Sequence, residues 1–341
     1  MSISGPTELE VVGKEDGLSG PGLDDPRADQ GPTAIQGRSL SAIAWRRLRR
    51  DRLALAGGVV IILFVLAAVF AGPITALYGQ DYTQSHNTGP KSLLDPLDSM
   101  PLGAFGGISA THWLGVTPVT GQDIFALLIY GARTSLIIAG AATALSLVLG
   151  VSLGVVAGYF RGWADNVISR TMDVLLSFPV LLLSISLITV VSFISNTEFV
   201  RFGVIIFVLG FFGWPYIGRI VRGQVLSLRE KEFVEAAKSL GSSNLRIMSR
   251  ELAPNLVGPI LVYTTLTIPS NILGEAGLSY LGIGVTPPTS SWGQMISDAS
   301  QYVQVDPIYL FLPGLALFIA VLAFNLFGDG LRDALDPKST R

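Results

Sequence analysis

The sequence predicts an all-α polytopic membrane protein with six transmembrane helices. Half of the 341 residues are hydrophobic and only 14% are charged, whereas about 25% of the residues in an average soluble domain are charged. Apolar stretches close to the roughly 20 residues that a bilayer core requires recur along the chain. The basic residues are also unevenly distributed among the segments that join these stretches. These three observations together indicate a chain that crosses a membrane several times.

The apolar stretches give the order of the predicted elements. Residues 1–37 are rich in Gly, Pro, Asp and Ser, and we expect them to form a disordered cytoplasmic tail. Residues 38–78 contain a basic helix followed by the first span, residues 79–132 a long loop, and residues 133–341 the remaining core. The predicted spans are Leu53–Leu77, Thr134–Ala157, Val174–Phe193, Phe202–Gly218, Leu256–Ala276 and Tyr309–Phe327.

The basic residues predict the side of the membrane that each loop faces. With a cytoplasmic N-terminus, all but three of the 23 Lys and Arg residues fall on the cytoplasmic side, the exceptions being Lys91, Arg133 and Arg201. Short cytoplasmic loops characteristically carry this excess of positive charge. We therefore expect a multi-pass protein of the cell membrane in contact with lipid, with both termini in the cytoplasm and residues 79–132 as an extracytoplasmic loop.

The composition excludes several classes of function. The net charge of −2 argues against nucleic-acid binding, and the absence of cysteine excludes disulfides and thiolate metal sites. The two histidines, His86 and His112, are interpreted as polar residues of the long loop. The chain has no G-x-x-x-x-G-K-[ST] phosphate loop and no credible catalytic triad. We expect no catalytic residue, metal site or cofactor on this chain.

The segment 219–255 is polar although it lies between two predicted spans, and this topology places it in the cytoplasm. Phe233, Ala236, Ala237 and Leu240 recur at helical spacing, and Gly241 ends that helix before a second one begins. In one interpretation, which the spacing alone favours, the helix lies at the lipid headgroups and braces the bundle. In the other, its small apolar face binds a cytoplasmic partner. Periodicity does not separate the two.

The stretch EAAKSLG, followed later by a proline, resembles the EAA motif of permease subunits of ATP-binding-cassette (ABC) importers. The resemblance implies that this cytoplasmic loop seats in an ATPase subunit and couples ATP use to transport. Glu251 and Ala253 stand where the general pattern has Ile and Leu. The coupling residues expected from the resemblance are Glu235, Ala236, Ala237, Lys238, Leu240, Gly241 and Pro254.

Longer blocks narrow the resemblance to the C-type subunit of dipeptide and oligopeptide permeases, over roughly residues 41–337. The blocks are Ala44–Ala71, Tyr130–Gly140, Gly274–Met295 and Gly328–Pro337. One departure is Gln122, which stands where the family pattern has Arg. The resemblance implies the type I ABC importer permease fold. It also implies as partners a homologous B-type permease, one or two ATPase subunits that bind ATP and Mg, and an extracytoplasmic peptide-binding protein.

Ionisable residues inside a membrane are costly and therefore functional candidates. Glu275 lies toward the outer end of the fifth span, and we consider it with Ser279 and Tyr280 as lining a translocation path. The alternative, which we favour, is a carboxylate hydrogen-bonded between helices. Asp173, at the inner edge of the third span, is expected to pair with Arg170.

The residues and the resemblance together favour a permease subunit of an ATP-driven dipeptide or oligopeptide importer. A permease for another solute, such as nickel complexes, is an alternative. A secondary transporter that works alone is a weaker one, since the sequence shows no clear internal repeat and no obvious coupling-ion residues. A membrane-embedded enzyme lacks a catalytic constellation.

Overall fold

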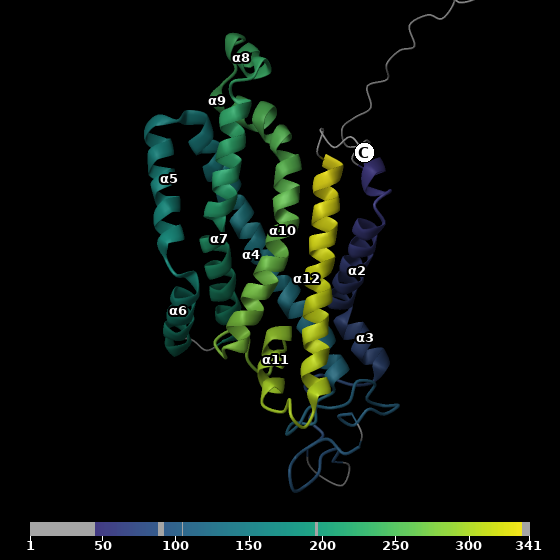
Figure 1. The fold of residues 1–341 in the computed structure, drawn as a ribbon. Helices are drawn as coiled ribbons and strands as arrows, with labels where there is room; N and C mark the ends of the chain where they lie inside the picture. The colour runs from purple at the N-terminus through teal and green to yellow at the C-terminus, as the bar shows by residue number, and fades with distance from the viewer. Residues whose placement is uncertain (1–44, 88–91, 104, 195–196, 336–341) are drawn as a thin grey trace, which may run out of the picture. The chain divides into compact units, whose positions relative to one another are not determined.

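The computed structural model describes residues 45–87, 92–103, 105–194 and 197–335, so the predicted tail 1–37 lies outside the described residues. Within these ranges the regular structure is helical, apart from two isolated bridges, Leu94–Pro101 and Val116–Asp123. The predicted all-α class is confirmed (Figure 1). The helices are α2 (Arg52–Val69), α3 (Ala71–Tyr78), α4 (Ile124–Phe160), α5 (Gly162–Ser177), α6 (Val180–Ile194), α7 (Glu198–Leu228), α8 (Glu232–Ser239), α9 (Asn244–Arg246), the π-helical η1 (Ile247–Leu252), α10 (Ala253–Tyr280), α11 (Trp292–Ser300) and α12 (Pro307–Leu335).

Five helical segments of the described chain are long and apolar enough to cross a membrane, and a bent pair provides a sixth span if it counts as one. The five are α2, α4, α7, the continuous run Asn244–Tyr280 that ends in α10, and α12. α7 continues through Pro215, although the Gly and Pro residues there make this span look interrupted in the sequence.

Two predicted spans are divided, which corrects their expected continuity. The third, expected as one helix over Val174–Phe193, consists of α5 and α6 at 82° to each other. Phe178 is extended at the break, the conformation favoured before a proline, and Pro179 follows it. The first, expected over Leu53–Leu77, is divided at Phe70 into α2 and α3.

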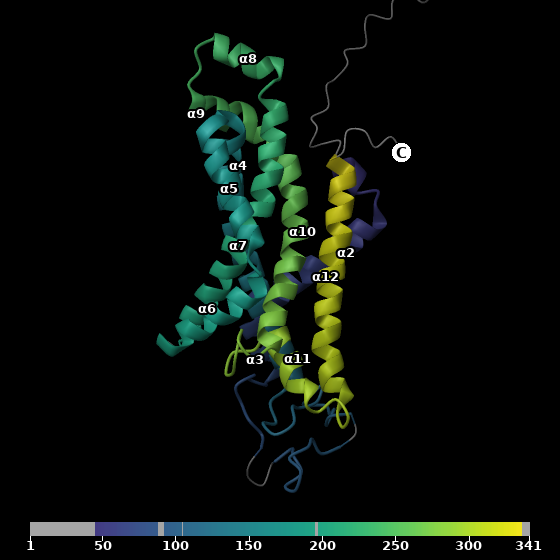
Figure 2. The same ribbon diagram turned by 60° about the vertical axis from the view of Figure 1, so that its left-hand side comes forward.

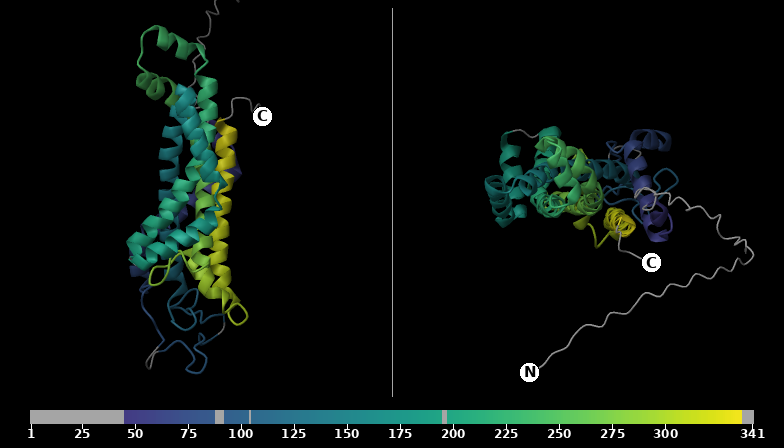
Figure 3. Two further views of the ribbon diagram at one scale, coloured as in Figure 1. Left: turned by 90° about the vertical axis from the view of Figure 1, so that its left-hand side faces the viewer. Right: turned by 90° about the horizontal axis from the view of Figure 1, so that it is seen from above.

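The helices place the segment containing α8 and the loop 79–123 at opposite ends of the described core. α12 packs against α2, α10 lies beside α12, and α4 runs along α7 (Figures 1 and 2). α8 extends past the ends of the neighbouring long helices, whereas α11 lies at the other end with the loop (Figures 2 and 3). The nine-residue helix α11 lies in a segment that the sequence analysis treated as loop.

A row of glycines brings α4 and α7 into close contact. Gly150, Gly154 and Gly158 recur every four residues on the face of α4 toward α7. A Cβ atom at position 154 would lie 2.7 Å from the backbone oxygen of Gly218, and one at position 158 would lie 2.7 Å from Cβ of Val225. Such small residues allow helix backbones to approach in a membrane, where dispersion replaces the hydrophobic effect as the driving force. α4 and α7 therefore form a tightly packed pair.

Replacing Gly154 by alanine should destabilise this pair, because the added methyl group meets backbone that has no other position to take. We expect a loss of about 1–3 kcal/mol, typical of overpacking, visible as a lower melting temperature of the detergent-solubilised protein. Gly140→Ala is the matched control in the same helix, since a Cβ there meets nothing within 4 Å. Equal melting temperatures for the two variants would contradict the proposed close contact.

Candidate functional site

The segment between α7 and α10 folds into two short helical arms, as predicted. The chain turns after Leu228 and enters α8, and the first arm ends before Gly241, which has a φ of 74°. This left-handed conformation favours glycine over residues with a Cβ. Ser243 then begins the second arm by accepting a hydrogen bond from the backbone N–H of Arg246. This second arm, α9 and η1, continues directly into α10.

An apolar cluster holds both arms against the long helices. Val234 of α8 and Leu252 of η1 are fully buried, and Ile247 is 1% exposed. They pack with Val225 of α7 and Tyr159 of α4. The two arms are thus anchored on the ends of α4, α7 and α10 rather than suspended in solvent.

Polar contacts reinforce this anchor at the end of α4. The Tyr159 hydroxyl donates to Oδ1 of Asn244 at 2.8 Å, and Nη1 of Arg229 donates to the Tyr159 carbonyl oxygen at 2.6 Å. Arg161 forms an ion pair with Glu230 at 2.6 Å between Nη2 and Oε1. The turn that leads into α8 is therefore tied to α4 as well as to α7.

The opposite side of α8 is exposed, and we call Phe233, Ala236 and Leu240 its outer face. Phe233 is 39% exposed and Leu240 is 86% exposed. Ala237, which the sequence analysis placed on the same face, is half-buried against the apolar cluster instead. Val234, the buried residue of α8, was not predicted to face the core. It lies three residues before Ala237, and this spacing places the two on the same face of the helix.

The remaining predicted coupling residues are also exposed. Glu235, Lys238 and Gly241 are exposed, and Nζ of Lys238 lies 5.9 Å from the centre of the Tyr159 ring. Pro254 is exposed in the first turn of α10. An apolar strip flanked by charges of both signs, mounted on a packed base, can receive the surface of another protein.

Of the residues considered for the translocation path, the structure brings two together. Oε2 of Glu275 accepts a hydrogen bond from Ser135 of α4 at 2.8 Å, and Oε1 accepts one from Ser279 at 2.7 Å. Glu275 is fully buried. The backbone N–H of Trp292 also donates to the Ser135 hydroxyl, at 3.3 Å. This network joins α4, α10 and α11, and Tyr280 is half-exposed outside it.

Asp173 pairs with Arg170 as expected, and it pairs more closely with Arg219. Nη1 of Arg170 lies 3.8 Å from Oδ2 of Asp173, and Nη2 of Arg219 lies 2.5 Å from Oδ1. Arg222 makes a second contact to α5, with Nε and Nη2 donating to the two carboxylate oxygens of Asp165 at 2.5 and 2.7 Å. Sequence reasoning missed both α7 arginines because their partners lie 46 and 57 residues away.

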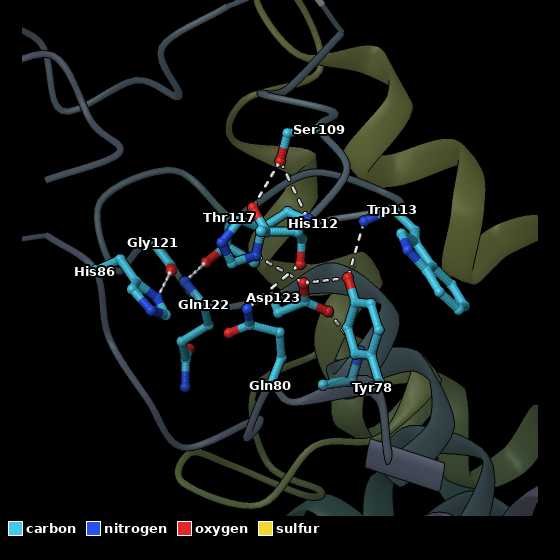
Figure 4. A network of polar contacts seen from close by, with 12 residues as sticks. Tyr78, Gln80, His86, Ser109, His112, Trp113, Thr117, Gly121, Gln122 and Asp123 are labelled. Carbon is cyan, nitrogen blue, oxygen red and sulfur yellow. Dashed lines mark hydrogen bonds and ion pairs between the residues drawn. The ribbon is translucent and has the colours of Figure 1, made fainter. Parts of the chain in front are cut away.

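The loop before α4 is organised around a buried histidine, shown in Figure 4. His112 is only 4% exposed, and its Nδ1 lies 2.8 Å from Oδ2 of Asp123. The Tyr78 hydroxyl donates to the same oxygen at 2.9 Å and accepts from the backbone N–H of Trp113 at 2.8 Å. His112 is thus a polar residue of the loop, as expected, and its burial also gives it a structural role that we did not predict.

These features describe a helical protein with five or six candidate membrane spans and an exposed apolar strip at one end. Residues 150–341 match the family of binding-protein-dependent transport system inner membrane components, and residues 39–92 match the N-terminal transmembrane domain of oligopeptide transport permease C. The chain belongs to this permease family of ABC importers. It is a multi-pass component of the inner membrane and not itself the ATPase of the transport system.

Named relatives cover most of the chain. Dipeptide transport system permease protein DppC of Alkalihalophilus pseudofirmus is 38% identical over 86% of this chain and 89% of that protein. Glutathione transport system permease protein GsiD of Escherichia coli O157:H7 is 38% identical to this chain, over 86% of this chain and 89% of that protein. GsiD of Pectobacterium atrosepticum is 35% identical, over 86% of this chain and 90% of that protein.

A solved structure supports the fold. A chain of the MetNI methionine ABC transporter, in an inward-facing conformation, aligns with a TM-score of 0.51 at 19% identity, covering 62% of this chain and 98% of that chain. The predicted ABC importer permease fold and the resemblance to the C-type peptide permeases are confirmed.

The base of the two arms should be sensitive to loss of its buried side chains. Ile247→Ala removes a side chain that is 1% exposed, and we expect a local destabilisation of about 2–5 kcal/mol. Hydrogen exchange of the backbone amides of residues 232–239 should then become faster. Leu245→Ala is the control, because Leu245 is 73% exposed two residues earlier. Unchanged exchange in Ile247→Ala would show that α8 does not depend on this cluster.

Proposed function

We propose that this chain forms half of the translocation pathway of an ATP-driven importer of short peptides, and that α8 couples the pathway to cytoplasmic ATPase subunits. The observation that supports the coupling role most directly is that one side of α8 is buried and the other is exposed. Its inner side, with Val234, is buried against α4, α7 and α10, whereas its outer face is exposed. A brace at the lipid headgroups needs no such rigid attachment to three spans.

The proposed mechanism is alternating access driven through this contact. ATP and Mg bind to one or two partner ATPase subunits, and their closure moves the outer face of α8. A partner shifts a conformational equilibrium only by as much as it binds the two states differently. The residues proposed for that differential contact are Glu235, Ala236, Ala237, Lys238, Leu240 and Gly241, with Pro254 at the start of α10.

The other proposed partners complete the pathway. A homologous B-type permease would supply the second half, and an extracytoplasmic peptide-binding protein would deliver the cargo. This assigns the end with α8 and both termini to the cytoplasm. The assignment is supported by the arginines and lysines between Arg219 and Arg250, and by the near absence of basic residues from the opposite end.

The cargo class is proposed from the relatives. Transport of dipeptides and of glutathione is named for proteins that are equally similar to this chain. A dipeptide and glutathione share a peptide-like backbone of two or three residues, so a short peptide is the common description. No observation in the structure favours nickel complexes, the other solute that the sequence leaves open.

Purification of the tagged chain from its native membrane in mild detergent tests the proposal. We expect a second permease and phosphate-loop ATPases to elute with it, and the ATPase activity to rise when a peptide-loaded binding protein is added. Recovery of this chain alone, stable and without ATPase activity, would instead support a carrier that works by itself.

A large side chain on the outer face of α8 should disrupt the coupling between the partner ATPase and transport. Ala236 is exposed, so Ala236→Trp alters no packing within the chain but obstructs a partner. We expect peptide uptake and peptide-stimulated ATPase activity to fall by about tenfold or more, the loss that a central interface residue can cause. Insertion in the membrane should be unchanged.

Ser249→Trp provides the matched control for this substitution. Ser249 is also exposed but lies on η1, in the other arm. We expect it to retain uptake close to that of the unaltered protein. Full uptake in Ala236→Trp, measured in membrane vesicles with equal amounts of inserted protein, would refute the coupling role of α8.

A further inference from the structure

A cavity of about 230 Å³ lies between α11, the first turn of α12 and the turn before α4. These elements lie at the end of the core opposite α8 (Figure 1). The turn before α4 supplies Gln122 to its wall, α11 supplies Gln294 and Asp298, and α12 supplies Tyr309. Gln301, exposed just after α11, lies at its edge. This cavity is smaller than the roughly 300–1,000 Å³ of sites that enclose a whole drug-sized ligand. It has room for one end of a solute.

The wall of the cavity is polar and bears negative charge. Among the described residues that line it there is no Lys, Arg or His, and Asp298 is the carboxylate. Gln294 donates a hydrogen bond to Oδ2 of Asp298, and Oδ1 accepts none within the described part of the chain. Burial raises the pKa of the Asp298 carboxyl, because a carboxylate withdrawn from water lacks a compensating cation. A cation in the cavity would supply that compensation.

Tyr309 contributes a second polar group to the cavity. Tyr309 is only 4% exposed, and it lines the cavity. Among the described residues, the one enclosed side-chain polar atom without a hydrogen-bond partner is Oδ2 of Asp306. The Tyr309 hydroxyl is therefore not enclosed without a partner but open to the cavity, where its oxygen is available to accept a hydrogen bond from a ligand.

The chemistry of this wall selects among cations. A primary ammonium combines one positive charge with three N–H donors, which suits the Asp298 carboxylate, the Tyr309 oxygen and the amide oxygens. A quaternary ammonium has no donor to offer. Calcium or magnesium would bind weakly, since such ions need about six oxygen ligands and usually more than one carboxylate.

We propose that this cavity binds the primary ammonium group of the imported solute at the extracytoplasmic end of the permease. The inference rests on the proposed function for the direction of transport and for the cargo class. A dipeptide and glutathione both carry a free primary ammonium, so the site serves either one. Binding here orients the amino end of the solute toward α11 before the solute enters the membrane.

Gln122 contributes a neutral amide to the cavity wall. Its Nε2 donates to the carbonyl oxygen of Tyr82 at 2.9 Å. An arginine at this position would place a fixed positive charge in the cavity wall and repel an ammonium. The neutral amide leaves Asp298 as the charge that a ligand meets.

The absence of cysteine from the chain permits a direct test. In membrane vesicles containing the full transporter, Gln301→Cys introduces one thiol at the edge of the cavity. Its modification is followed on the peptide that contains residue 301. The probes are the 2-aminoethyl, 2-(trimethylammonio)ethyl and 2-sulfonatoethyl methanethiosulfonates, with each rate divided by the rate for a small free thiol.

We expect the aminoethyl reagent to react about tenfold faster than the trimethylammonio reagent, the ratio that one hydrogen bond to a charged group supplies. The sulfonate should be slowest. Asp298→Asn retains an acceptor for Gln294 but should abolish the preference, and Tyr309→Phe should reduce it. Asp98→Asn, a matched loss of charge on an exposed loop residue at the same end, should preserve it. Equal rates for the two cations, or an undiminished preference in Asp298→Asn, would overturn the proposal.

A protection assay extends the test to solutes. Alanyl-alanine or S-methylglutathione, which keeps the free ammonium but has no thiol to consume the reagent, should slow alkylation of Gln301→Cys by N-ethylmaleimide, and N-acetylalanyl-alanine should not. Equal protection by the free and acetylated dipeptides would overturn the ammonium site. These measurements need no ATP and no binding protein, so they are separate from transport. Uptake that depends on α8 without any ammonium preference refutes this site alone, and the reverse pattern refutes the coupling role alone.

Discussion

Close packing of α4 against α7 is the constraint on which the position of α8 depends. Gly154 and Gly158 leave no space for a Cβ between the two helices, so neither helix slides along the other without separating from it. α7 leads into α8 through three residues, and Tyr159 in the last turn of α4 holds the start of the second arm through Asn244. A displacement of α8 therefore acts on both helices as a unit. Packed elements of this kind move between discrete arrangements instead of deforming continuously.

Ion pairs at the same end extend this unit to α5, with unequal contributions. The Arg219–Asp173 and Arg161–Glu230 pairs are about half exposed, and such pairs are worth about 0–1 kcal/mol each. Arg222 and Asp165 are more buried and share two hydrogen bonds, so this pair is the stronger one. The 82° bend between α5 and α6 lies beyond these contacts. These contacts hold α5 to α7, whereas α6 is joined to α5 through the break at Pro179.

Membrane spans could be predicted from the sequence more accurately than side-chain contacts, because a span depends on local apolar length and a contact depends on residues far apart in the chain. Apolar length alone locates a bilayer crossing, but it does not report where the backbone turns, so the break at Pro179 was read as part of a continuous helix. The face of α8 was assigned from four apolar residues, yet packing on α4 and α7 selected Val234 as its buried centre. The burial of His112 depends on Asp123, folded against it across a loop without periodicity. No local pattern encodes such a pairing.

The charge asymmetry that predicts topology also has a structural use at each end. At the α8 end, arginines that follow the positive-inside pattern are paired with carboxylates. Two of these pairs join α7 to α5, and the third ties the end of α4 to the turn that leads into α8. At the opposite end, Asp298 has only an amide for a neighbour, in a wall without a described basic residue. A charge left without a counter-ion costs stability, and the fold tolerates that cost where a cationic solute can offset it. In the orientation that we propose, the same charge bias leaves an anionic cavity on the extracytoplasmic side.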